Sequence, residues 1–266
     1  MSEEIRLIVE GDDFGMCHAV NEAVIKCFKE GIMTQTSLLV PPPWFTESAH
    51  LCKENPEMQV GVHLDLCAEW YPYRWRPVLP ISKVPTLVDR DGYFYRTNQE
   101  FLEAKPKVDE VEKELRAQVQ LALDKGINVT YLDTHMGTAS IMPEMKKAVE
   151  KISREFKIPL SSVLGEKFGI QWAGLIESVS DDWTRQRDPK DRPKALLDIV
   201  KGLKPGLWMT ILHPGLDTSE MRAMDFSPVA SQRQGNTDAL TNPEVKEMIK
   251  QKGIQLVGFK DLIEKQ

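Results

Sequence analysis

The feature that most constrains the fold is the regular alternation of short apolar runs with amphipathic segments along the chain. The apolar runs predict strands at residues 5–10, 36–40, 60–66, 129–132, 207–212 and 255–259. The amphipathic segments predict helices at residues 19–30, 46–54, 108–125, 144–156, 195–203 and 243–252. Strands that alternate with helices form βαβ units and a parallel sheet, and strands this apolar are covered on both faces.

The size of the chain suits a single domain of this kind. It has 266 residues, of which 41% are hydrophobic, and α/β barrels are commonly this long. We expect an α/β fold with one (β/α) barrel, regular or irregular, over residues 1–266. An open doubly wound sheet is the second interpretation, although the chain has no glycine-rich nucleotide-binding motif.

One long segment, residues 67–106, interrupts the alternation after the third predicted strand. It is too long for a structureless loop in a compact domain, so we expect an aromatic-rich insertion near the active-site face. Asp91 and Gly92 lie between two short apolar runs and predict a hairpin turn. Four of the five tyrosines of the chain lie in this insertion.

Four side chains are candidates for contact with a substrate. Trp70 and Trp75 lie in the insertion, where packing is the first interpretation of an aromatic residue and stacking on a sugar ring the second. Arg74 and Arg233 either pair with carboxylates or bind an anionic group on a sugar.

Charge, the length of apolar runs and cysteine usage argue against a nucleic-acid partner and a membrane span and indicate a cellular compartment. The formal net charge is −6 and no basic stretch is present, which argues against a nucleic-acid partner. No apolar run reaches about 18 residues, so we expect no membrane span. The four cysteines show no CxxC spacing, which favours a reducing, cytoplasmic compartment. The sequence leaves open whether the chain forms a homo-oligomer.

Acidic and histidine residues gather at the ends of the predicted strands. Asp12 and Asp13 follow the first strand, His63 lies in the third, and His135 and His213 follow two later ones. The carboxyl ends of parallel strands meet at one edge of the sheet, where ligands bind. One Asp and two His form a common ligand set for a catalytic divalent metal ion, which would also keep a neighbouring acid ionised.

Each of these residues also has an ordinary structural interpretation when it is taken alone. Two aspartates before a glycine commonly form a capped turn, and a lone histidine is more often a hydrogen-bonded core residue than a metal ligand. The metal interpretation depends on the joint pattern. His18 and His50 lie in helical segments, and we interpret both as structural.

The order of these motifs resembles that of the YdjC-like (ChbG-type) carbohydrate deacetylases. The family's ADDFG element appears as GDDFG at residues 11–15, and its GxHLxL element as GVHLDL at 61–66. Its DxH element appears as DTH at 133–135, and its late HP element at 213–214. Order and approximate spacing agree from about residue 5 to residue 260.

The resemblance implies a (β/α) barrel related to the polysaccharide deacetylases. It implies that Asp13, His63 and His135 bind one divalent metal ion, with zinc or magnesium the first candidates. It also implies that Asp12 is the general base and His213 the general acid.

The expected function is removal of an N-acetyl group from an amino sugar or short oligosaccharide, a small-molecule substrate. One alternative is a metal-dependent hydrolase of another ester, amide or phosphoester, and another is a catalytically silent sugar-binding barrel. Many relatives continue the third motif with further histidines, whereas this chain reads HMGTA at residues 135–139, so the motif does not name the sugar.

Overall fold

A computed structural model describes residues 4–178 and 186–264, and its strands and helices alternate as predicted. The strands are β1 (Ile5–Phe14), β2 (Gln35–Leu38), β3 (Gln59–Leu64), β4 (Val129–Thr134), β5 (Gln171–Trp172), β6 (Gly206–Leu212) and β7 (Gln255–Leu256). The helices are α1 (His18–Glu30), α2 (Phe45–Glu54), α3 (Asn98–Glu103), α4 (Val108–Asp124), α5 (Pro143–Phe156), α6 (Ser161–Phe168), α7 (Arg192–Gly202), α8 (Ser219–Met224), α9 (Val229–Leu240), α10 (Pro243–Gln251) and α11 (Phe259–Glu264).

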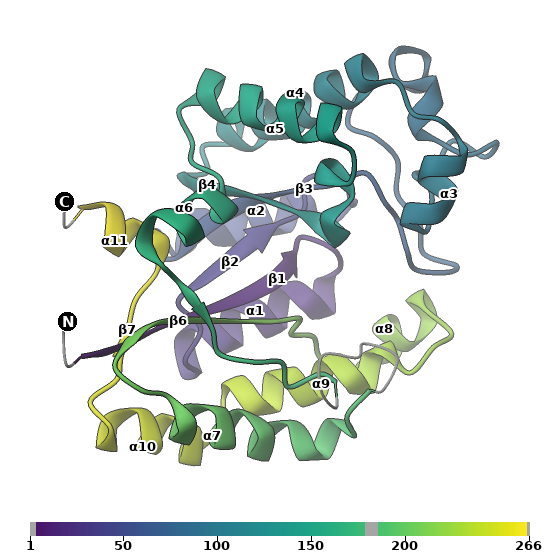
Figure 1. Cartoon of the computed structure of the whole chain (residues 1–266). Coiled ribbons are helices and arrows are strands. Elements are labelled where there is room, and N and C mark those ends of the chain that lie inside the picture. The colour runs from purple at the N-terminus through teal and green to yellow at the C-terminus, as the bar shows by residue number, and fades with distance from the viewer. Residues whose placement is uncertain (1–3, 179–185, 265–266) are drawn as a thin grey trace.

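All strand pairs of the sheet are parallel. The order is β4-β3-β2-β1-β6-β5, with β7 beside β1. Figure 1 shows this sheet curling between α4 and α5 on one side and α7, α9 and α10 on the other. The strand order begins with β4 and ends with β5, and the sheet curls between these two strands. It therefore has the shape of a half-barrel. The α/β prediction is therefore confirmed, with the barrel in its irregular form.

The central strand β1 is buried on both faces, as its apolar sequence predicts. Leu7 and Val9 belong to the large core between the sheet and its helices. Ile8 points to the opposite face and packs in a smaller cluster with Tyr131 and Phe259, whose rings lie 5.0 Å apart. This alternation matters for the site, because the later residues of β1 carry the two aspartates.

The insertion after β3 has its own substructure, which buried acids of α4 hold in place. The Glu114 carboxylate accepts backbone N–H bonds from Val78 and Leu79 at 2.9 and 3.0 Å. Glu110 accepts a bond from the backbone amide of Thr86 at 2.8 Å. These bonds satisfy the backbone of a loop-rich segment that lacks a sheet or a long helix to do so.

The predicted hairpin turn at Asp91 and Gly92 is present, with an antiparallel bridge between Val88 and Phe94. Gly92 has a φ of 82°, which a residue without a side chain adopts at little cost.

The sequence prediction was wrong at the last strand, and it missed several short elements. Residues 255–259 were expected to be one strand, but β7 ends at Leu256 and Phe259 begins α11. The Asp261 carboxylate accepts the Gly258 amide at 2.7 Å and the Gln35 side chain accepts the Phe259 amide at 2.9 Å, which favours the helix start. Strand β5 has only two residues, too few for a periodic pattern. Among the described helices, none is long and apolar enough to cross a membrane.

Candidate metal centre

The two adjacent aspartates reach the same cleft because β1 ends in an irregular turn. Neighbouring side chains of a regular strand point to opposite faces. The pairing of β1 with β2 shifts register between Gly11 and Phe14, and Asp13 has a φ of 70°, in the left-handed region. The Met16 amide donates to the Asp13 carbonyl at 3.0 Å and holds this turn. As a result both Asp12 and Asp13 line one cleft.

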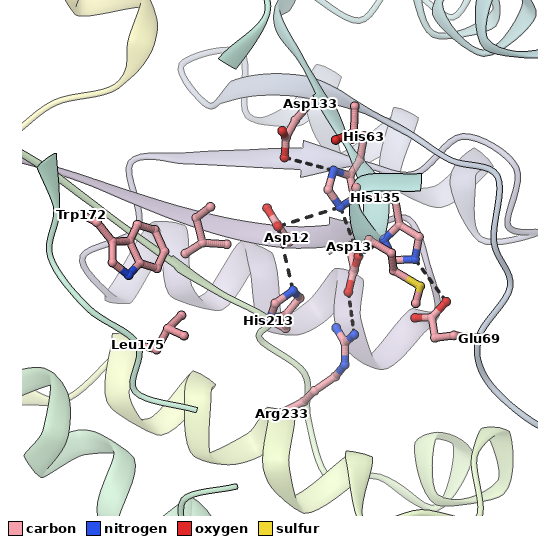
Figure 2. A pocket seen from close by; sticks show the side chains of 14 residues that line it. Asp12, Asp13, His63, Glu69, Asp133, His135, Trp172, Leu175, His213 and Arg233 are labelled. Atoms are coloured by element: carbon pink, nitrogen blue, oxygen red, sulfur yellow. Dashed lines mark hydrogen bonds and ion pairs between the residues drawn. The ribbon is translucent and has the colours of Figure 1, made fainter. Parts of the chain in front are cut away.

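The three predicted metal ligands converge from separate strands. Asp13 is the next-to-last residue of β1, His63 lies in β3, and His135 directly follows β4. Asp13 Oδ1 lies 3.7 Å from His63 Nε2 and 3.2 Å from His135 Nδ1. One donor atom from each residue lies within 4.8 Å of the other two. Figure 2 shows the carboxylate and both rings facing one another.

A carboxylate lies at the far nitrogen of each of these imidazole rings. Asp133 Oδ2 is 3.4 Å from His63 Nδ1, and Glu69 Oε2 is 3.1 Å from His135 Nε2. A proton on the far nitrogen leaves a lone pair on the nitrogen that faces Asp13. This is the arrangement in which histidine ligands of metal ions are commonly held.

A second set of donor atoms, from Asp12, His63 and Asp133, is equally close together. It shares His63 with the first set. Asp133 lies at the Nδ1 side of that ring, where it is placed to orient the imidazole. We therefore take the set that contains Asp13 as the candidate site.

Arg233 pairs with Asp13 instead of facing outward. Its Nη2 atom donates to Asp13 Oδ2 at 2.5 Å, and its guanidinium carbon lies 5.1 Å from the centre of the Trp70 ring. Burial raises the pKa of Asp13, but Arg233 and then His135 hold it well below its ordinary range. Of the two sequence interpretations of Arg233, the structure therefore shows pairing with a carboxylate.

The Asp12 carboxylate lies next to a serine hydroxyl group and two histidine rings. The Ser37 hydroxyl donates to Asp12 Oδ1 at 2.6 Å. Asp12 Oδ2 lies 3.8 Å from His63 Nε2 and 3.9 Å from His213 Nε2. Burial raises the pKa of Asp12 and outweighs the lowering by the two histidines. The two aspartates, side by side in sequence, therefore have opposite pKa shifts.

His213 lies on the other side of Asp12 and has its own carboxylate partner. His213 Nδ1 is 2.9 Å from Glu177 Oε1, and the Asn236 side chain donates to the His213 carbonyl at 2.9 Å. Burial lowers the pKa of His213, but Glu177 raises it more, to about 9. Burial raises the pKa of Glu177, and His213 and Arg192 bring it down to about 2. The pair is thus an ion pair at neutral pH.

Trp75 and Arg74, two of the candidates for substrate contact, are not brought to the cleft. Trp75 is 2% exposed, and its indole N–H donates to Asp65 Oδ2 at 2.6 Å. Arg74 pairs with Asp89 at 3.1 Å and lines a separate surface hollow. Trp70 is 3% exposed beneath Arg233, which leaves little ring surface for a sugar. Packing explains these residues because the insertion needs a core of its own.

The sequence analysis missed several residues of the site, among them Glu69, Glu177 and Trp172. Glu69 and Glu177 lie in stretches with no periodic pattern, so nothing local distinguished them from surface acids. Trp172 belongs to the two-residue strand β5. His18 and His50 pair with glutamates on helices α1 and α2 outside the cleft, in keeping with a structural role.

The cleft that holds these groups has a volume of about 690 Å³. Its lining residues are Asp12, Asp13, His63, Glu69, Asp133, Thr134, His135, Met136, Gly137, Trp172, Leu175, Ile211, His213 and Arg233. This volume is typical of small-molecule sites, which span roughly 300–1,000 Å³.

A family model described as YdjC-like protein matches residues 6–251, which is most of the chain and includes all these side chains. The chain belongs to the YdjC-like family. The family resemblance expected from its four motifs is thereby confirmed.

Relatives of this YdjC-like chain align over nearly its whole length. A carbohydrate deacetylase of Clostridium beijerinckii is 30% identical and covers 97% of this chain and 100% of its own. A carbohydrate deacetylase of Thermoanaerobacter pseudethanolicus is 28% identical, with coverage of 95% and 97%. A crystal structure from Enterococcus faecalis V583, described as a proposed cellobiose-phosphate cleavage protein, is 25% identical, with a TM-score of 0.76 and coverage of 97% and 99%.

Proposed function

We propose that this YdjC-like protein is a metal-dependent hydrolase that removes N-acetyl groups from an amino sugar or short oligosaccharide. The observation that carries the proposal is the convergence of Asp13, His63 and His135 beside Asp12 and His213 in one cleft. The full-length relatives named carbohydrate deacetylases support the same activity. The whole chain forms one catalytic domain in this proposal, with the insertion at its active-site face.

The residues present fit a divalent cation held by Asp13, His63 and His135. Asp13 Oδ1 is buried and has no hydrogen bond among the described residues, although two ring nitrogens face it. A buried carboxylate oxygen without a donor is costly, and a cation at this point would satisfy it. The mixed nitrogen and oxygen donors favour zinc and also admit magnesium.

Amide hydrolysis needs an activated water, a stabilised oxyanion and a proton for the leaving amine. When bound, a divalent cation lowers the pKa of water and polarises the acetyl carbonyl. Asp12 takes the proton of the attacking water as general base, and the Ser37 hydroxyl fixes its orientation. His213 donates a proton from Nε2 to the amine nitrogen, since Glu177 holds its Nδ1 side and keeps the ring protonated.

The alternatives differ in product. A phosphoesterase of the same site would release phosphate, and a different amide or ester hydrolase would release another acid. A catalytically silent barrel would bind sugar without turnover. The cleft holds all the side chains that this proposal needs as base, acid and metal ligands, which supports a hydrolase over a silent binder.

The test is an acetate-release screen over N-acetylated amino sugars and their short oligomers, joined to a metal-content measurement. We expect acetate release that a chelator abolishes and that zinc or another divalent ion restores. His63→Ala should lose both bound metal and activity. Absence of acetate release from every substrate, with phosphate release from a phosphorylated sugar, would replace the proposal by its first alternative.

A further inference from the structure

One wall of the cleft is apolar and takes no part in the proposed chemistry. It consists of Trp172, Leu175 and Ile211. Figure 2 places Trp172 and Leu175 on one side of the cleft and Glu69 on the other, with Asp12 and His213 between them. The cleft therefore has an apolar wall facing one that carries the Glu69 carboxylate beside Met136.

Trp172 presents its indole ring openly in this wall. Trp172 is 46% exposed, whereas Trp70 and Trp75 of the insertion are 3% and 2% exposed. Leaving an indole half uncovered forgoes much of the free energy that its burial would supply. Large aromatic surface that stays exposed in a cleft is typical of a binding surface.

The backbone that carries this ring is anchored to the neighbouring strand β6. Strand β5 pairs with β6, with Trp172 opposite Met209, and the Ala173 amide donates to the Met209 carbonyl at 2.9 Å. The Thr210 hydroxyl donates to the Gly174 carbonyl at 3.0 Å. Because β6 leads directly to His213, the aromatic ring and the proposed general acid are held by the same pair of strands.

We propose that Trp172 is the platform on which the substrate's sugar ring stacks, with Leu175 and Ile211 extending the apolar surface. A pyranose ring has an apolar C–H face and a polar edge of hydroxyl groups, which matches this pair of unlike walls. The inference rests on the proposed function for the identity of the ligand as a carbohydrate. It assigns sugar stacking to β5 and not to the aromatic insertion.

The experiment compares Trp172→Ala and Trp172→Phe with Phe226→Ala. Phe226 is a matched control, because it is an aromatic residue that is 75% exposed, packs on Tyr71, and does not line the cleft. Each variant is loaded with metal, checked for Tm and metal content, and assayed with a disaccharide of N-acetylglucosamine. Binding of the corresponding glucosamine disaccharide, which lacks acetyl groups, is measured by calorimetry.

In the Trp172→Ala variant we expect KM for the acetylated disaccharide to rise about tenfold, with kcat changed by less than about twofold. A tenfold loss of affinity lies near the upper end of what a single aromatic contact contributes to binding. Affinity for the glucosamine disaccharide should fall by a similar factor. Trp172→Phe should recover much of both losses, and Phe226→Ala should change neither.

Unchanged KM and affinity in Trp172→Ala would overturn the platform. Weaker binding of the acetylated sugar alone would also overturn it, since the ring would then contact the acetyl group and not the pyranose. Failure of the proposed function is distinguishable. If no acetate is released, the glucosamine titration still tests whether Trp172 binds a sugar ring.

Discussion

The charge on Glu177 should set the alkaline limit of activity, and Glu177→Gln tests this. The proposed general acid His213 works only when protonated, so activity is lost as pH rises through its pKa of about 9. Burial lowers this pKa and the Glu177 carboxylate raises it. An opposite charge in contact shifts a pKa by about 1–3 units. Replacing Glu177 by a neutral glutamine should therefore lower the alkaline limit of activity by about 2 pH units.

The size of the effect follows from the protonated fraction. At pH 8 a group with a pKa of about 9 is roughly 90% protonated, and one with a pKa of about 7 is roughly 10% protonated. We therefore expect kcat/KM of Glu177→Gln to fall about tenfold at pH 8 and to change little at pH 6. The measurement is the pH profile of kcat/KM for acetate release, with equal metal content in both proteins.

Glu47→Gln is the matched control. Glu47 Oε1 lies 2.8 Å from His18 Nδ1, nearly the 2.9 Å that separates Glu177 from His213, but this pair lies outside the cleft. Its pH profile should match that of the unchanged protein. If Glu177→Gln lowers the rate equally at every pH, or leaves the alkaline limit in place, His213 is not the acid whose proton Glu177 holds.

Three further predictions concern the metal site. Asp12→Asn should keep the bound metal while turnover falls by about 10² or more. Asp13→Asn should instead lower metal occupancy. Equal loss of metal in both variants would contradict this division of roles. His63→Ala should abolish metal binding with little change in Tm, because the hydrophobic core does not depend on this ring; a large fall in Tm, measured by calorimetry, would make the residue structural. Asp133→Asn and Glu69→Gln should each weaken metal affinity by about 10–100-fold in a competition titration with a chelator, and unchanged affinity would mean that these carboxylates do not position the imidazoles.

Much of the architecture followed from local pattern. Apolar periodicity is a property of neighbouring residues, so it located all the long strands and most of the long helices before any tertiary contact was known. It failed where packing, not pattern, decides. The inner face of α9 carries the buried polar residues Arg233, Asn236 and Thr237, so the helix lacks the apolar stripe that the prediction needs.

The sequence by itself indicated which candidate ligands could meet, because Asp12, Asp13, His63 and His135 each lie at or next to the carboxyl end of a strand and parallel strands bring those ends together. Only the tertiary structure decided what surrounds them. The register shift in β1 and the left-handed backbone of Asp13 bring Asp12 and Asp13 into one cleft, and Glu69 reaches His135 from a loop. Such contacts join residues that share no local pattern. For the same reason the stacking surface falls to Trp172, on a strand too short to predict.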